Sequence, residues 1–219
     1  MRVSLRGSIT SVGFASGDRF VVGAWDRSPL GPFGDVMWAQ ASGRRLLLVP
    51  SERVADFITA VYDFDAVLVV ELRVHRAGRQ ISVSAGPIAL EAGGGRGWRI
   101  PGGALRPAWW HRLVEAPVAR ATMGVNVFGT SPSGVHEWYR ADVYRRVTAA
   151  TASVDGADLG LLRPIDPPCR FGFSEPPRRP SMVDVRPLLS DPSGRLDEAI
   201  SRERAVADRA TSARPSDHR

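Results

Sequence analysis

The stretch SPLGPFGDVMWA, residues 28–39, gathers prolines and glycines around Phe33 and then turns into an apolar run that begins after Asp35. Proline fixes the backbone angle φ and lacks an N–H donor, whereas glycine permits positive φ, so their alternation predicts a rigid crossover. We expect this crossover to deliver Asp35 to the start of a strand over 35–41, at the mouth of a barrel. The alternative is a structural loop whose Asp35 caps neighbouring amides, and spacing alone favours that alternative.

Short strands separated by turn residues extend from this stretch in both directions. Val3, Leu5, Gly7 and Ile9 alternate with polar residues, which predicts a strand at the N-terminus. Gly and Ser pairs such as Ser42-Gly43 mark the turns between later strands. The other expected strands cover 19–25, 45–49, 66–76, 80–90, 118–129, 135–148 and 181–189.

One helix is expected with a clear start signal. Ser51 is placed to cap residues 51–62, Glu52 follows in the first turn, and an apolar residue recurs at helical spacing. The residues of that face are Val54, Phe57, Ile58 and Val61. Residues 107–116 predict a second, short helix, and a weak apolar stripe predicts a helix in the tail.

Together these elements predict a mainly β fold, a β-rich α+β protein. A large antiparallel sheet curls or splits, so we expect a closed or partly open barrel or a double sheet. The main helix is at about 51–62. We expect one barrel-like domain over 1–189, with the proline-rich segment 163–180 wrapped around it, and a helical or disordered tail over 190–219.

The composition excludes several functions. All 29 basic residues among the 219 are arginines, so no lysine side chain is available for Schiff-base chemistry. The net charge is +6, but the arginines are scattered, so we expect no nucleic-acid partner. No apolar run is long enough to span a membrane. The single cysteine, Cys169, fits a reducing compartment, and we expect a cytoplasmic protein.

Residues 28–35 resemble the Ser-x-x-Gly-Pro-Tyr-x-Glu segment of the acetoacetate decarboxylase family. In that family the segment leads into a barrel strand whose acid faces the active site. The resemblance implies that Asp35 stands at the position of the family's glutamate and Phe33 at that of its tyrosine. It also implies a barrel around a small cavity for β-keto acids. The family's Schiff-base lysine is missing here, where the chain reads YDFDAV over 62–67. The resemblance therefore implies the fold and the cavity without that decarboxylation.

A second acid interrupts an otherwise apolar strand. Glu71 lies two residues before Arg73, hence on the same face of an expected strand, where the pair could hold a polar ligand at the barrel mouth. The alternative is a face that reaches solvent, and that alternative is favoured. The predicted polar ligand-binding residues are Arg27, Asp35, Glu71 and Arg73, and the apolar ones are Trp25, Met37 and Trp38.

Other motifs indicate little chemistry. His136 could act as a general base but is expected on a half-exposed strand, and Trp109-Trp110-His111 is expected to be structural. The glycine-rich loop 92–97 lacks the P-loop pattern. No histidine or cysteine spacing indicates a metal site, and we expect no cofactor.

Two functions remain open. The first is a protein with a cavity for a small molecule such as a carboxylate or keto acid, whether or not it catalyses a reaction. The second is a non-enzymatic interaction protein with a solid core, which forms a homodimer through the tail or through residues 163–180.

Overall fold

The computed structural model describes residues 2–100, 128–130, 134–172, 175–192 and 194–201. These described residues are rich in strands and include two helices. The helices are α1 (Glu52–Thr59) and a segment over 195–201. The strands are β1 (Arg2–Ser4), β2 (Arg6–Phe14), β3 (Arg19–Arg27), β4 (Phe33–Ala39), β5 (Arg45–Val49), β6 (Ala66–Val69), β7 (Leu72–Ala77), β8 (Gln80–Ala85), β9 (Ile88–Gly94), β10 (Trp98–Arg99), β11 (Phe128–Thr130), β12 (His136–Trp138), β13 (Ala141–Val154), β14 (Ala157–Asp158), β15 (Leu162–Arg163), β16 (Ser181–Val185) and β17 (Leu188–Ser190).

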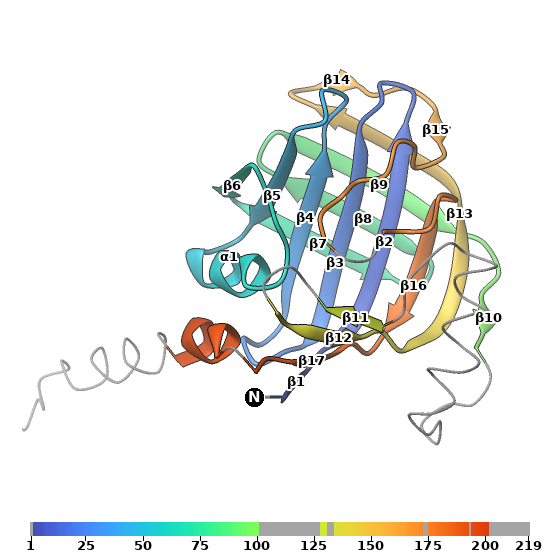
Figure 1. The fold of residues 1–219 in the computed structure, drawn as a ribbon. Coiled ribbons are helices and arrows are strands. Elements are labelled where there is room, and N and C mark those ends of the chain that lie inside the picture. Colours follow the sequence, from blue (N-terminus) through green and yellow to red (C-terminus); the bar gives the residue numbers. More distant parts are fainter. Residues whose placement is uncertain (1, 101–127, 131–133, 173–174, 193, 202–219) are drawn as a thin grey trace, which may run out of the picture.

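Most strands belong to one sheet, in the order β6-β5-β4-β3-β2-β16-β13-β9-β8-β7 (Figure 1). Neighbours along this path pair antiparallel, except β5 and β6, which run parallel with α1 between them. A parallel pair needs a crossover connection, and a helix is the usual one. A second, four-stranded sheet has the order β1-β17-β12-β11.

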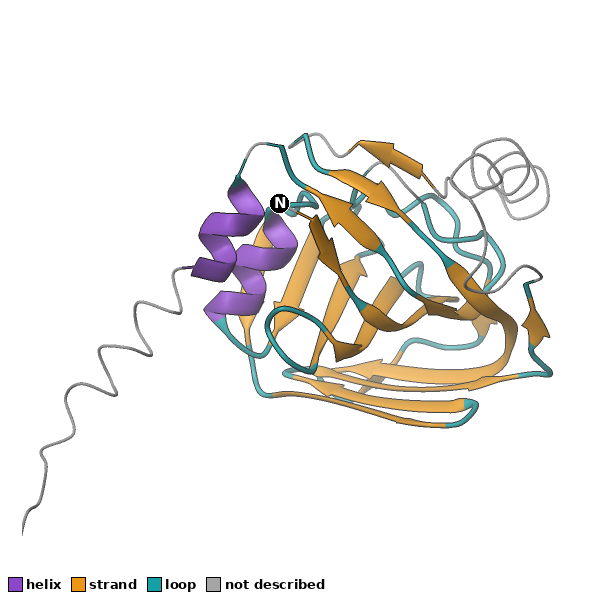
Figure 2. Cartoon of the chain, turned by 90° about the horizontal axis from the view of Figure 1, so that it is seen from below, coloured by secondary structure: helices purple, strands orange, loops and turns teal. Residues whose placement is uncertain are grey.

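The main sheet curls into a half barrel, so that β7, β8 and β9 lie behind β2–β5 (Figures 1 and 2). Gly34 marks a close approach of the two halves, because a Cβ there would lie 3.1 Å from a methyl carbon of Leu72 and closer still to Val74. In the described part of the chain, β6 and β7 end the path without pairing to each other. The expectation of a curled, strand-rich sheet is confirmed in this half-barrel form.

The two faces of β2–β5 are both buried, and strand alternation divides them. Even-numbered side chains such as Phe20, Val22 and Leu48 pack against Ile81 and Leu90 from the other half of the sheet. The middle of the half barrel is therefore filled with hydrocarbon. Odd-numbered side chains point to the opposite face, which α1 and the second sheet cover.

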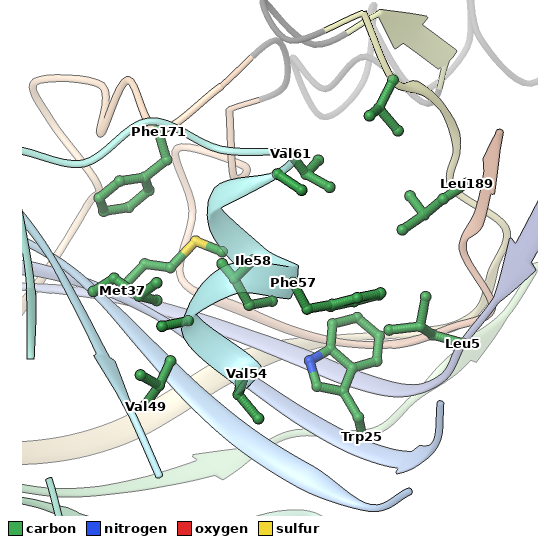
Figure 3. Close-up of a cluster of buried hydrophobic side chains, with 14 of the residues drawn as sticks. Leu5, Trp25, Met37, Val49, Val54, Phe57, Ile58, Val61, Phe171 and Leu189 are labelled. Atoms are coloured by element: carbon green, nitrogen blue, oxygen red, sulfur yellow. The ribbon is translucent and has the colours of Figure 1, made fainter. Parts of the chain in front are cut away.

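Helix α1 covers this odd-numbered face. Figure 3 shows side chains of the sheet, including Trp25 and Met37, packed with Phe57 and Ile58 of the helix. The Ser51 hydroxyl accepts a hydrogen bond from the Val54 N–H at 3.4 Å, as expected for an N-cap. The helical segment 195–201 joins the same cluster through Leu196 and Ile200. The main helix is confirmed, although it ends at Thr59 rather than Tyr62.

Two expected strands are each divided. The apolar run 66–76 forms β6 and β7, which lie at opposite ends of the sheet. The chain changes partner at Val70 and Glu71: the Val70 N–H donates to Val49 O at 2.9 Å, whereas Glu71 O accepts from the Gly86 N–H at 3.2 Å. Residues 135–148 likewise divide into β12 and the start of β13. Periodicity reports which residues alternate, and it carries no information about a change of partner strand.

Some expectations lie outside the described residues: the helix over 107–116 with Trp109, Trp110 and His111, most of the strand over 118–129, and the tail beyond 201. The proline-rich segment is described for the most part, and it buries Ile165, Cys169 and Phe171 against the α1 cluster. Within the described ranges, no helix has the length and apolar character needed to cross a bilayer.

We predict that Leu47→Ala lowers the free energy of unfolding by about 2–5 kcal/mol, because Leu47 is fully buried between β4, β6 and α1 and its removal leaves a cavity. The matched control is Leu161→Ala, since Leu161 is 72% exposed. This control should change stability by about 0.5 kcal/mol or less. Urea denaturation of both variants measures the difference, and equal losses would contradict the layer arrangement.

Candidate functional site

A cavity of about 160 Å³ lies on the odd-numbered face of the main sheet. Strands β2, β3, β4 and β16 contribute one wall, and Ile58 of α1 contributes to another. Phe171 and residues 175–177 of the proline-rich segment also line it. Most of the lining is apolar, and its polar side chains include Asp35, Tyr62 and Tyr139.

Asp35 enters this cavity from β4 and is 1% exposed. Gly23 lies directly opposite it on β3, and a Cβ at Gly23 would overlap the Asp35 carboxylate. The Trp25 indole Nε1–H donates a hydrogen bond to Asp35 Oδ1 at 2.8 Å. In the described part of the chain, the other carboxylate oxygen has no hydrogen-bond partner. The glycine therefore provides the space for a buried acid that a single donor holds.

Burial controls the ionisation of Asp35. Removal from water raises the pKa of the carboxyl from 3.8 to about 6, and the hydrogen bond from Trp25 opposes part of that rise. At neutral pH the group is mostly ionised, yet it binds a proton far more readily than an exposed aspartate does. A carboxylate with that property can act as a general base.

A second acid lies at the same cavity through two tyrosines. Glu137, on β12, is 2% exposed. The Tyr62 hydroxyl lies 3.0 Å from each of its carboxylate oxygens and also forms a short hydrogen bond with the Tyr139 hydroxyl. Tyr62 follows α1, and Tyr139 follows β12. The three groups form a hydrogen-bonded chain that begins at the buried Glu137 and reaches the cavity at Tyr62 and Tyr139.

Burial also shifts the ionisation of this chain. It raises the pKa of Glu137 from 4.5 to about 8, with the hydrogen bond from Tyr62 acting in the opposite direction. The pKa values of both tyrosines are raised well above 10, first by burial and then by the negative charge of Glu137. At neutral pH the chain therefore carries no charge, and its members can serve as hydrogen-bond donors.

The structure brings three predicted site residues together. Trp25, Asp35 and Met37 all line the cavity, because they occupy odd-numbered positions on adjacent strands. The cavity lies between the sheet and α1, however, and not inside the barrel, where the sequence predicts it. Asp35 stands inside β4 rather than at its first position, since the strand begins at Phe33.

The other four predicted residues lie elsewhere. Glu71 and Arg73 form an ion pair of 2.5 Å, with side chains 76% and 80% exposed, so they stand in solvent. Arg27 is exposed opposite Arg6 and does not reach Asp35. Trp38 occupies an even-numbered position, stacks on Phe20 and donates to Asp18. Alternation along β4 excludes Trp38 from the face of Asp35.

The sequence pattern does not single out Tyr62, Glu137 or Tyr139 as site residues. Alternation places Glu137 and Tyr139 on one face and His136 on the other, and this is the one signal available. His136 instead contacts Thr130 Oγ1 at 2.8 Å, in an exposed pair. The helical pattern predicts Tyr62 only as the end of a helix, and the tertiary fold alone brings it to β12.

The described residues show neither a reactive cysteine nor a metal-binding cluster. Cys169 is buried, and burial raises the pKa of its thiol to about 12, so it stays protonated. No group of three or more His, Cys, Asp or Glu side chains with metal-binding geometry occurs in the ranges that the structure describes.

We predict that Asp35→Asn changes how stability depends on pH. Because the pKa of Asp35 is higher in the folded protein, the folded state binds more protons than the unfolded chain between about pH 4 and pH 6. The free energy of unfolding of the natural protein therefore falls as pH rises through this window, by about 3 kcal/mol for this group. The asparagine of the variant carries no charge at any pH. The free energy of unfolding of the variant should therefore rise relative to that of the natural protein over the same window, as measured by urea denaturation.

The control for this prediction is Asp65→Asn. The Arg45 side chain donates to Asp65 and lowers its pKa. The free energy of unfolding of the natural protein should therefore rise relative to that of this variant as pH rises. Parallel pH profiles for the Asp35 variant and the natural protein would show that Asp35 is not buried as an acid.

Comparisons of the chain with protein-family models, curated proteins and solved structures found no match. The resemblance to the acetoacetate decarboxylase family, carried by residues 28–35, therefore stays a prediction.

Proposed function

We propose that this protein binds a compact, uncharged molecule that carries a carbonyl group. The observation that supports this most is the cavity of about 160 Å³ with Asp35, Tyr62 and Tyr139 in its lining. An engineered cavity of about 150 Å³ in another protein holds benzene, so a ring of that size fits here. Sites for small molecules generally combine such an apolar lining with a few polar groups that fix orientation.

The charge of the lining favours an uncharged ligand over a carboxylate or keto acid. Among the described lining residues, Asp35 and Glu175 are acids, and none is an arginine or histidine. A ligand carboxylate would be buried beside Asp35 without an opposite charge, which is strongly unfavourable. A carbonyl oxygen needs only a hydrogen-bond donor, and the Tyr62 hydroxyl can supply one.

Schiff-base decarboxylation is not part of this proposal. The chain has no lysine, so it offers no side-chain amine that could condense with a carbonyl. Binding through hydrogen bonds alone leaves the carbonyl group intact and makes the affinity modest. Such binding is measurable with a simple ring ketone as the probe.

We predict that cyclopentanone binds more tightly than methylenecyclopentane, which has the same shape but no oxygen. One neutral hydrogen bond corresponds to about a 3- to 10-fold difference in affinity. Tyr62→Phe should abolish this difference, whereas Tyr144→Phe should keep it, because Tyr144 lines the cavity outside the Glu137 chain. Ligand-observed NMR measures each dissociation constant. Equal affinities in the natural protein would refute recognition of the carbonyl group, and no binding of either would refute the proposed function.

The alternative function is an interaction protein, and one observation favours it. Strand β6 is a terminal strand of the main sheet, and its residues Val67, Leu68 and Val69 are 38–45% exposed. An exposed apolar edge strand is a template for pairing with another chain. A second copy of this chain fits best, because two identical edges can pair antiparallel about a two-fold axis.

We predict for this alternative that the natural protein is a dimer in analytical ultracentrifugation and that Leu68→Lys makes it a monomer. A charged side chain on an edge strand opposes pairing. Leu161→Lys is the matched control, since Leu161 is exposed but lies far from β6 in the sheet order, near β15. A natural protein that is monomeric at all concentrations would exclude this alternative.

A further inference from the structure

We propose that the cavity catalyses proton transfer at the carbon next to a bound carbonyl group, with Asp35 as the base and Tyr62 as the donor to the carbonyl oxygen. Glu137 is the positioning residue that orients the Tyr62 hydroxyl. This inference rests on the proposed function, because it requires that a carbonyl compound binds in the cavity.

The position of Asp35 suits a base. Its Oδ1 accepts the Trp25 N–H at 2.8 Å, which fixes the carboxylate plane, and its other oxygen has no partner among the described residues. The side chain is 1% exposed and lines the cavity, so the carboxyl group lies at the cavity and is largely shielded from bulk water. A base for carbon acids needs both properties: it must be poorly solvated and held in place.

The position of Tyr62 suits the carbonyl oxygen. Its hydroxyl contacts Glu137 on one side and the Tyr139 hydroxyl on the other, and both tyrosines line the cavity. In the structure the Tyr62 hydroxyl donates to Glu137. A protonated Glu137 can instead donate its O–H to the Tyr62 oxygen, which frees the Tyr62 proton for Tyr139 or for a ligand. When Glu137 is ionised, it accepts the Tyr62 proton and turns the donor away from the ligand.

The proposed step is balanced within the site. The C–H bond next to the carbonyl breaks, the proton moves to Asp35, and the electron pair forms a C=C bond while negative charge develops on the carbonyl oxygen. The Tyr62 hydroxyl stabilises that oxygen by a hydrogen bond that strengthens as charge develops. Return of the proton from Asp35 to the same carbon restores the ketone without a label. Where the proton on Asp35 exchanges with solvent deuterium before the return, the carbon gains deuterium.

The titratable groups around Asp35 determine the pH dependence. Tyr62 lines the same cavity from the end of α1, Tyr139 from the residue that follows β12, Tyr144 from β13 and Glu175 from the proline-rich segment. Glu137 lies behind Tyr62, with which it shares a hydrogen bond. Glu175 accepts the backbone N–H groups of Cys169 and Arg170 at 2.8 Å each, so its carboxylate is held by the loop. Activity needs Asp35 ionised and Glu137 protonated, which gives a maximum between pH values of about 6 and about 8.

The experiment measures deuterium incorporation into cyclopent-3-enone in D2O by proton NMR. This ring ketone has the size of cyclopentanone. Its protons between the carbonyl and the double bond are acidic enough for their exchange with deuterium to be measured. The natural protein should accelerate exchange above a protein-free control, with a bell-shaped pH profile. Asp35→Asn should lower the rate by about 100-fold or more while it keeps the ligand bound, because an asparagine side chain accepts no proton.

Two further variants separate the outcomes. Glu137→Gln is permanently neutral and its amide donates to Tyr62, so exchange should persist above about pH 8, where the natural protein loses it. Asp65→Asn, an exposed acid paired with Arg45, should leave the profile unchanged. Binding without accelerated exchange overturns this inference and leaves the proposed function intact. Absence of binding overturns both, and exchange that survives Asp35→Asn overturns the role of Asp35.

Discussion

The burial of Asp35 opposite Gly23 is the constraint on which the site depends. A carboxylate removed from water is unfavourable unless other groups compensate, and here one indole N–H does so. The hydrogen bond from Trp25 to Asp35 and the space left by Gly23 require that these three residues share one face of the sheet. The β3–β4 register provides this arrangement. A slip of one residue would turn Asp35 into the hydrocarbon between the two halves of the sheet.

The stretch 28–39 sets this register. The Ser28 hydroxyl donates to Gly31 O at 2.6 Å and accepts the Leu30 N–H at 2.9 Å, and Gly31 has a φ of +79°, which favours glycine. Gly34 then allows β7 to cross close to β4. The loop, the crossing and the buried acid therefore explain why proline and glycine are concentrated here, although Asp35 accepts the Trp25 indole N–H and does not cap backbone amides of the described residues.

The sequence is sufficient for the local features and insufficient for the long-range ones. Ser51 predicts the helix start, and alternation predicts most strands and the face shared by Trp25, Asp35 and Met37. The division of 66–76 cannot be predicted, because β6 and β7 are both apolar in pattern and differ in their partners. For that reason the sequence makes Glu71 a candidate buried acid, although it lies in solvent.

The second half of the site shows the same limit. Tyr62 and Glu137 are separated by 75 positions in the chain and meet because the parallel β5–β6 pair places α1 over the odd-numbered face, while β17 holds β12 beside it. No periodic pattern records that meeting. A cue does exist in the alternation that groups Glu137 with Tyr139, but it becomes informative only when the face they share is known to be buried.

The two acids reach different protonation states by the same physical cause. Burial raises the pKa of both, to about 6 for Asp35 and about 8 for Glu137, so that neutral pH lies between them. Two carboxyl groups whose environments separate their pKa values in this way can supply a base, Asp35 at the cavity, and a neutral group, Glu137 behind Tyr62. Apolar side chains at both positions would avoid the cost of burying acids. A buried site that departs from the most stable choice, with its polar groups directed at a cavity, is where function is expected.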